Sequence, residues 1–254
     1  ESGFTYILLE EIIRAFADRL FPGVKVLDCA AFRITRNADM GVREDLAGDL
    51  LDQMREVLTE RQESDGVRLE IEKGASPEAR AFLREALRVD EADIYPVPGP
   101  LDLAAFFRLA NLSGYDALKI EAWSPQAVPE ASAADSMFEV IKRGNRLLFH
   151  PYESYDPVLR LVQEAADDPG VLAIKQVLYR VSDNSPVVAA LMRAAERGKH
   201  VTALIELKAR FDEARNIDWA DALARAGAQV IYGVKGYKTH AKICVVVRRE
   251  PGGV

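Results

Sequence analysis

A histidine with basic neighbours stands near the end of the sequence, and two arginines precede it at regular intervals. His240 is flanked by Lys238 and Lys242. Arg180 and Arg210 precede it in steps of 30 residues. An unprotonated imidazole is a competent nucleophile near neutral pH, while guanidinium groups bind phosphate oxygens in pairs and stay charged. The pattern predicts phosphoryl transfer, with His240 as the nucleophile and the four basic residues as phosphate ligands.

Each of these residues also has a purely structural interpretation. A single histidine among lysines and arginines is usually a solvated surface residue. The two arginines have acidic residues nearby in the sequence, at Asp183, Asp212 and Glu213, and salt bridges to them would explain both. The other two histidines, His150 and His200, have no basic cluster, and we interpret them as structural or surface residues.

Apolar segments alternate with helical patterns around these basic residues, which predicts an α/β domain over residues 135–254. Strands are expected at 146–150, 171–179, 201–207, 229–232 and 243–247, and helices at 156–166, from 186 to Gly198, and at 217–226. Repeated units of this kind indicate a parallel sheet with helices on both faces. Ligands of such sheets bind at the carboxyl ends of the strands, so the basic residues should meet at one edge.

The first half of the sequence mixes helical and strand patterns and predicts an α+β domain over residues 1–125. Helical spacing covers 4–20 and 44–61, and an N-cap with a first-turn proline begins a helix at 78–87. Residues 24–34 have extended character, and 67–72 alternate strictly, as in a strand. Residues 123–134 follow neither period and are interpreted as the connection between the domains.

The composition is that of an ordinary globular protein, with 49% apolar and 29% charged residues. A net charge of -7 argues against a surface devoted to nucleic acid, although a local basic pocket is compatible with it. No apolar run approaches the roughly 18 residues of a membrane span, and no signal peptide is visible. We therefore expect a cytoplasmic protein without a transmembrane segment, at most peripherally bound to a membrane.

The cysteines and the ends of the sequence allow two further expectations. Cys29 and Cys244 show no metal-binding spacing, and we interpret both as small buried apolar residues in a reducing compartment. The sequence begins at Glu1 and stops at Val254 after a turn-like Pro-Gly-Gly, which suggests an internal fragment of a longer protein.

Several long motifs resemble the polyphosphate kinase family and occur in that family's order. Four segments resemble the catalytic core of the family: His150–Pro157, Leu172–Arg180, Glu206–Glu213 and Lys238–Lys242. Four further segments resemble the family's middle, or head, domain: Leu9–Ile13, Leu20–Gly23, Phe32–Arg36 and Pro98–Leu103. The resemblance covers nearly the whole chain. It implies a phospholipase D-like catalytic half, a parallel or mixed sheet with flanking helices, preceded by the α+β middle domain.

The resemblance also implies roles for individual residues and for partners. His240 would be the phosphohistidine nucleophile, and His240 with Lys242 would form the His-x-Lys pair of the phospholipase D fold. The family's magnesium-associated arginines match Arg180 and Arg210. A guanidinium has no lone pair for a cation, so we expect both to hold phosphates that bind Mg²⁺. The substrates would be ATP or ADP and inorganic polyphosphate, and the intact enzyme would be a homo-oligomer.

Two other functions remain open. A phospholipase D-like phosphodiesterase would use His240 to attack a phosphodiester, although the two arginine motifs favour a polyanionic substrate. A non-catalytic module would bind polyphosphate or a partner through its basic loops. Family members also have a helical N-terminal domain and a second catalytic half, so we expect this fragment to be inactive alone.

Overall fold

The computed structural model describes residues 3–38, 50–131, 135–209, 211–234 and 237–253. The chain forms two compact units, one of Glu1–Gly41 with Thr59–Ile120 and one of Val42–Leu58 with Glu121–Val254. Helix α3 (Leu50–Glu63) has residues in both units. Its Leu51 and Met54 are buried in the core of the second unit, which explains why the helix's first turns belong there. The expected domain limits, 1–125 and 135–254, stay a prediction.

The first unit contains a three-stranded sheet in the order β1-β2-β3. Strand β1 (Phe32–Arg36) is antiparallel to β2 (Gly66–Glu72), and β2 is parallel to β3 (Ile94–Val97). The strict alternation in β2 buries Leu69 and Ile71 on one face. The helices and 3₁₀ turns of this unit are α1 (Leu9–Ala15), α2 (Ala17–Leu20), α4 (Pro77–Leu87), α5 (Phe107–Ala110), η1 (Glu91–Asp93), η2 (Leu103–Phe106) and η3 (Asp116–Leu118).

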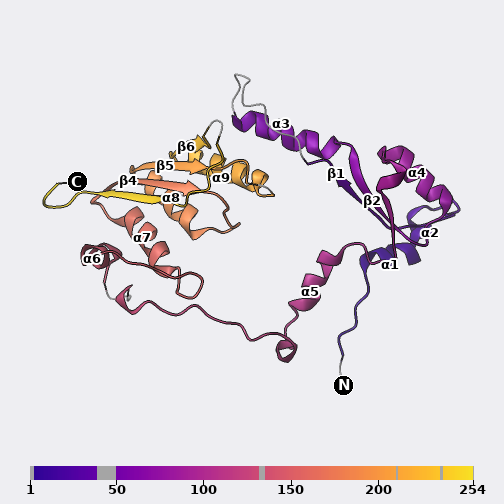
Figure 1. Ribbon diagram of the computed structural model, residues 1–254, viewed down its shortest axis with the longest axis horizontal. Helices are drawn as coiled ribbons and strands as arrows, with labels where there is room; N and C mark the ends of the chain where they lie inside the picture. Colours follow the sequence, from indigo (N-terminus) through magenta and orange to yellow (C-terminus); the bar gives the residue numbers. More distant parts are fainter. Residues whose placement is uncertain (1–2, 39–49, 132–134, 210, 235–236, 254) are drawn as a thin grey trace. The chain divides into compact units, whose positions relative to one another are not determined.

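The second unit contains a four-stranded mixed sheet in the order β6-β5-β4-β7 (Figure 1). Strands β4 (Val171–Leu178), β5 (His200–Ile205) and β6 (Gln229–Tyr232) are parallel, and β7 (Cys244–Arg248) is antiparallel to β4. The helical elements here are η4 (Pro129–Ala131), α6 (Met137–Lys142), α7 (Asp156–Asp167), α8 (Pro186–Glu196) and α9 (Glu213–Arg225). The predicted α/β class is confirmed.

The direction of β7 follows from the path of the chain after β6. The chain leaves β6 at the carboxyl edge of the parallel strands, and the described residues after it, 233–234 and 237–243, include no helix that would return the chain to the opposite edge. Strand β7 therefore begins at the carboxyl edge, where the backbone N–H of Val177 donates to the carbonyl of Ile243 at 2.9 Å. The repeated βα pattern by itself indicated a parallel sheet, whereas the family resemblance implied a parallel or mixed sheet, and the antiparallel β7 makes the sheet mixed.

One face of this sheet carries most of the buried core. Ile174, Leu178, Val201 and Ile205 are buried on it and pack with α7, α8 and α9. Because β4, β5 and β6 follow one another in a single direction, right-handed crossovers place α8 and α9 on the same side. The prediction of helices on both faces does not hold for these helices, and Val245 on the opposite face is 45% exposed.

Two local expectations are wrong. Residues 146–150 form no strand, and Leu147 is 94% exposed. Cys29 is exposed and Cys244 is half-buried, so neither is a fully buried apolar residue. Among the residues that the structure describes, no helix has both the length and the apolar character required to cross a bilayer.

Candidate active site

The carboxyl edge of the second sheet is formed by three segments that leave parallel strands. Tyr179 and Arg180 follow β4, Glu206 follows β5, and the loop that carries His240 follows β6. Because the loop after β6 crosses to β7, it passes over the ends of β5 and β4 on its way. The topology of the sheet therefore brings His240 to the tip of β4, whose last residue, Leu178, lies 62 positions earlier in the sequence.

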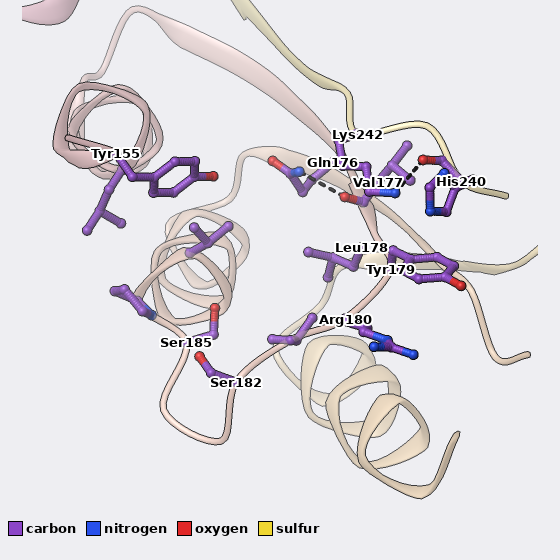
Figure 2. Close-up of a pocket in the computed structure, with 14 residues that line it drawn as sticks. Tyr155, Gln176, Val177, Leu178, Tyr179, Arg180, Ser182, Ser185, His240 and Lys242 are labelled. Atoms are coloured by element: carbon purple, nitrogen blue, oxygen red, sulfur yellow. Dashed lines mark hydrogen bonds between the residues drawn. The ribbon is translucent and has the colours of Figure 1, made fainter. Parts of the chain in front are cut away.

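A pocket of about 880 Å³ opens at this edge (Figure 2). Its lining includes His240 and Lys242 from the loop before β7, and Tyr179 and Arg180 from the end of β4. The first residues of α7 and α8 form the other side. The pocket thus combines an imidazole with an ammonium group and a guanidinium group, and the two cationic groups can bind phosphate oxygens.

The ring of Tyr179 lies between the three basic side chains. Its centroid is 4.9 Å from that of the His240 imidazole, and the two planes meet at 84°. The ammonium of Lys242 lies 4.5 Å from the same centroid, and the guanidinium carbon of Arg180 lies 5.9 Å from it. Lys242 also donates a hydrogen bond to the backbone carbonyl of His240 at 2.5 Å. Tyr179 therefore sets the spacing of the basic groups around the imidazole.

Arg180 is both a salt-bridge partner and a pocket residue, so the structural and the functional interpretations of this arginine are compatible. Its Nε lies 3.0 Å from a carboxylate oxygen of Asp212, so the salt bridge suggested by sequence proximity is present. The side chain nevertheless remains 56% exposed and lines the pocket. Asp212 also pairs with Arg215 at 2.8 Å, so its carboxylate is held from two sides. The salt bridge orients the guanidinium at the pocket without burying it.

A second tyrosine lies across the pocket from the histidine. Tyr155, the residue before α7, directs its phenol into the pocket in Figure 2. Burial raises the pKa of the Tyr155 hydroxyl, so at neutral pH it remains protonated and able to donate a hydrogen bond. Burial likewise raises the pKa of the nearby Cys244 thiol, which disfavours the reactive thiolate.

The predicted site residues divide into three groups. His240, Arg180 and Lys242 line one pocket. Lys238 is exposed and does not contribute to its lining. Arg210 lies outside the described residues. Sequence analysis missed Tyr179 and Tyr155 as pocket residues, although the position of Tyr179 directly before Arg180 was a usable signal.

No group of three or more histidine, cysteine, aspartate or glutamate side chains with the geometry of a metal site occurs within the described ranges. The described basic side chains of the pocket, from Arg180 and Lys242, carry no lone pair for a cation when protonated. They suit a phosphate that carries its own cation rather than direct coordination of a metal.

Two family models match the chain. Residues 1–109 match the polyphosphate kinase middle domain, and residues 136–254 match polyphosphate kinase C-terminal domain 1. The sequence is 57% identical over 254 residues to a polyphosphate kinase from Rhodopirellula baltica, covering 100% of this chain and 30% of that protein. It is 48% identical to a polyphosphate kinase from Bacillus anthracis, covering 98% of this chain and 36% of that protein.

A solved structure gives the same result at the level of the fold. The crystal structure of polyphosphate kinase from Porphyromonas gingivalis matches with a TM-score of 0.65 and 29% sequence identity. The match covers 96% of this chain and 34% of that chain. This chain therefore spans about a third of the length of the proteins that it resembles.

Proposed function

Because this chain belongs to the polyphosphate kinase family, we propose that the pocket around His240 transfers the terminal phosphate of ATP to polyphosphate, in the intact protein. The observation that carries this proposal is the common pocket of His240, Arg180 and Lys242 at the carboxyl edge of the sheet. A lone solvated histidine, the structural alternative, would not require cationic side chains on the same pocket wall.

The first step is an attack by an unprotonated ring nitrogen of His240 on the γ-phosphorus of ATP. A phosphorus–nitrogen bond forms, and the bond to the oxygen that bridges the β and γ phosphates breaks. The electron pair of that bond leaves with ADP, and the other ring nitrogen keeps its proton. In the second step a terminal oxygen of polyphosphate attacks the same phosphorus, and the electron pair of the broken phosphorus–nitrogen bond returns to the imidazole.

The cationic side chains lower the barrier of both steps. Arg180 holds equatorial phosphate oxygens with a guanidinium whose orientation is set by Asp212. Lys242 lines the same pocket, 4.5 Å from the centroid of the Tyr179 ring, and neutralises charge as the transition state spreads it over these oxygens. We assign Arg210 the same role from the sequence motif alone.

Magnesium fits this site through the substrate. The basic side chains offer it no ligand, so Mg²⁺ would arrive on the phosphates of ATP and supply further charge neutralisation there. Arg180 would bind the remaining oxygens of those phosphates. With ATP as the donor, we assign the reaction to the cytoplasm.

Labelling of the intact protein with ATP that carries ³²P in its γ position tests the proposal. The expected product is a protein-bound label that is stable in base and lost in acid, as a phosphohistidine is. His240→Ala should abolish the label, whereas His200→Ala, an exposed histidine at the start of β5, should retain it. Label and polyphosphate synthesis that persist in His240→Ala would overturn the proposal and favour a non-catalytic binding module. Cleavage of phosphodiesters without any label from ATP would favour the phosphodiesterase.

A further inference from the structure

A buried carboxylate accepts a hydrogen bond from the backbone of the residue that precedes the proposed nucleophile. Glu206, the residue after β5, is 2% exposed. A carboxylate is costly to bury unless its oxygens receive hydrogen bonds. Both oxygens of Glu206 do so, since Oε1 accepts the backbone N–H of Lys208 at 2.8 Å and Oε2 accepts that of Thr239 at 2.5 Å. Thr239 immediately precedes His240, so this bond acts on the backbone of the nucleophile.

The backbone of Glu206 is also linked to the end of β4, through the side chain of Asn216. Its carbonyl accepts a hydrogen bond from the side-chain amide of Asn216 at 2.9 Å, and the same amide donates to the carbonyl of Tyr179 at 2.8 Å. Asn216 is completely buried in α9. Glu206 and Asn216 together, here called the Glu206–Asn216 anchor, therefore join the end of β4, the end of β5 and the His240 loop.

The anchor holds one side of His240, and the sheet holds the other. On the carboxyl side, the carbonyl of Ile243 accepts the N–H of Val177 at 2.9 Å as β7 begins. Between these two points the loop is exposed at His240 itself. A nucleophile on an exposed loop keeps its direction only if the backbone on both sides is fixed, and the buried bond from Glu206 supplies the fixed point before it.

We propose that Glu206 is a positioning residue that orients His240 for phosphoryl transfer by holding the Thr239 N–H. This inference rests on the proposed function, because it concerns the rate at which His240 is phosphorylated. Glu206 does not line the pocket and acts through the backbone. An ionised acceptor makes a hydrogen bond about twice as strong as a neutral one, which explains a carboxylate at a buried position where an amide has a similar shape.

Glu206→Gln in the intact enzyme is the direct test. Glutamine keeps the shape but offers one acceptor oxygen, so the N–H of either Thr239 or Lys208 faces an NH₂ group. We expect phosphohistidine formation at saturating ATP to fall about 10- to 100-fold, because small displacements of a reacting group cost rates of this order. The KM for ATP should stay within about twofold, because Glu206 does not contact the phosphates.

Glu164→Gln is a matched control. Its carboxylate on α7 also accepts a backbone N–H, that of Met137 at 2.7 Å, but Met137 begins α6 and does not belong to the loop that carries His240. This variant should phosphorylate His240 at the parental rate even if its melting temperature falls. If Glu206 had a purely structural role, the rate of His240 phosphorylation in both variants would change only in proportion to the loss of melting temperature. That result would overturn the proposal.

A second substitution covers the case in which Glu206→Gln does not fold. Glu206→Asp keeps the charge but is one methylene too short to reach both N–H groups, so an intermediate rate at an unchanged melting temperature is expected. A parental rate in a folded Glu206→Asp protein would contradict the proposal. His240→Ala runs in the same assay: a label that persists there rejects the proposed function, whereas a label lost there but normal in Glu206→Gln rejects the positioning role alone.

Discussion

The ring of Tyr179 and the imidazole of His240 meet in a T-shaped arrangement, with centroids 4.9 Å apart and planes at 84°. The same ring receives the ammonium of Lys242 at 4.5 Å. An aromatic residue at the end of β4 thus contacts two groups of a loop that enters from β6. This arrangement gives the pocket a fixed apolar surface against which its reactive and cationic groups are spaced.

Replacing this ring should slow phosphorylation of His240. Tyr179→Leu removes the aromatic face and edge, and contacts of this kind are worth roughly 0.5–1.5 kcal/mol each, so we expect a fall of about 5- to 50-fold in the rate. Tyr179→Phe keeps the ring and should remain within about threefold of the parent. Single-turnover labelling from ³²P-ATP measures both. Equal rates in the leucine and phenylalanine variants would show that the ring has no part in positioning His240.

Arg180 should be sensitive to a substitution that preserves its charge. Arg180→Lys replaces a planar fork with a point charge, so paired contacts to phosphate are lost and kcat/KM for ATP should fall about 10- to 100-fold. The comparison variant is Arg215→Lys, which changes another arginine that pairs with Asp212 but is absent from the pocket lining. Steady-state kinetics of the intact enzyme should show a much smaller change there. Equal losses in both variants would mean that the salt bridge, not phosphate binding, explains the effect.

Asp212→Asn tests the orientation of the Arg180 guanidinium separately. The substitution removes the negative charge that lies 3.0 Å from Arg180 Nε and leaves the arginine in place. We expect a loss of activity of about 3- to 10-fold, smaller than that of Arg180→Lys, because the phosphate-binding fork itself remains. The loss should appear in the KM for ATP. A larger loss than in Arg180→Lys would instead point to a direct role of Asp212 in the reaction.

Acid should weaken the end of the sheet opposite the pocket through Asp168. Burial by itself would raise the pKa of this carboxylate, but hydrogen bonds from Arg248 at 2.8 Å and from the Gly170 N–H at 2.6 Å lower it below its ordinary value. The folded pKa is therefore below the unfolded one. The stabilisation is complete above about pH 4 and disappears as the pH falls through the lowered folded value.

Asp168→Asn should accordingly destabilise the second unit by about 1–2 kcal/mol at pH 7, and the difference from the parent should shrink toward pH 3. Denaturant midpoints of the intact protein at the two pH values measure it. Asp218→Asn, which alters an exposed residue of α9, is the control and should show no such difference. If the difference in unfolding free energy between Asp168→Asn and the parent grew in acid, the pKa of Asp168 would be raised on folding instead of lowered, and the prediction would be wrong.

The two cysteines should react at different rates with an alkylating reagent. Cys29 is exposed, whereas burial raises the pKa of the half-buried Cys244. The thiolate is the reactive form, so at pH 8 we expect Cys29 to be modified at least about tenfold faster. Mass spectrometry of peptides from the intact protein, sampled over time, gives both rates. Faster modification of Cys244 would contradict the burial of its thiol.

Local signals in the sequence predicted most elements of the fold. Ser76 and Ser185, each followed by proline, were expected to begin helices, and both accept the capping hydrogen bond, from Ala79 and Val188 respectively. Such signals work because a cap involves residues three positions apart. The expected strand at 146–150 failed for the converse reason. An apolar run forms a strand only where another strand is available to pair with it, and that depends on the rest of the chain.

By itself the sequence indicated candidate groups for the chemistry and, through intervals of one βα unit, predicted that Arg180 and His240 would reach the same edge of a sheet, where both line one pocket. The tertiary structure alone decided how they are held there. Glu206 binds a residue 33 positions later, and Asn216 binds one 37 positions earlier. These hydrogen bonds exist because the chain crosses the sheet edge on its way to an antiparallel β7, and no local pattern of residue types encodes that crossing.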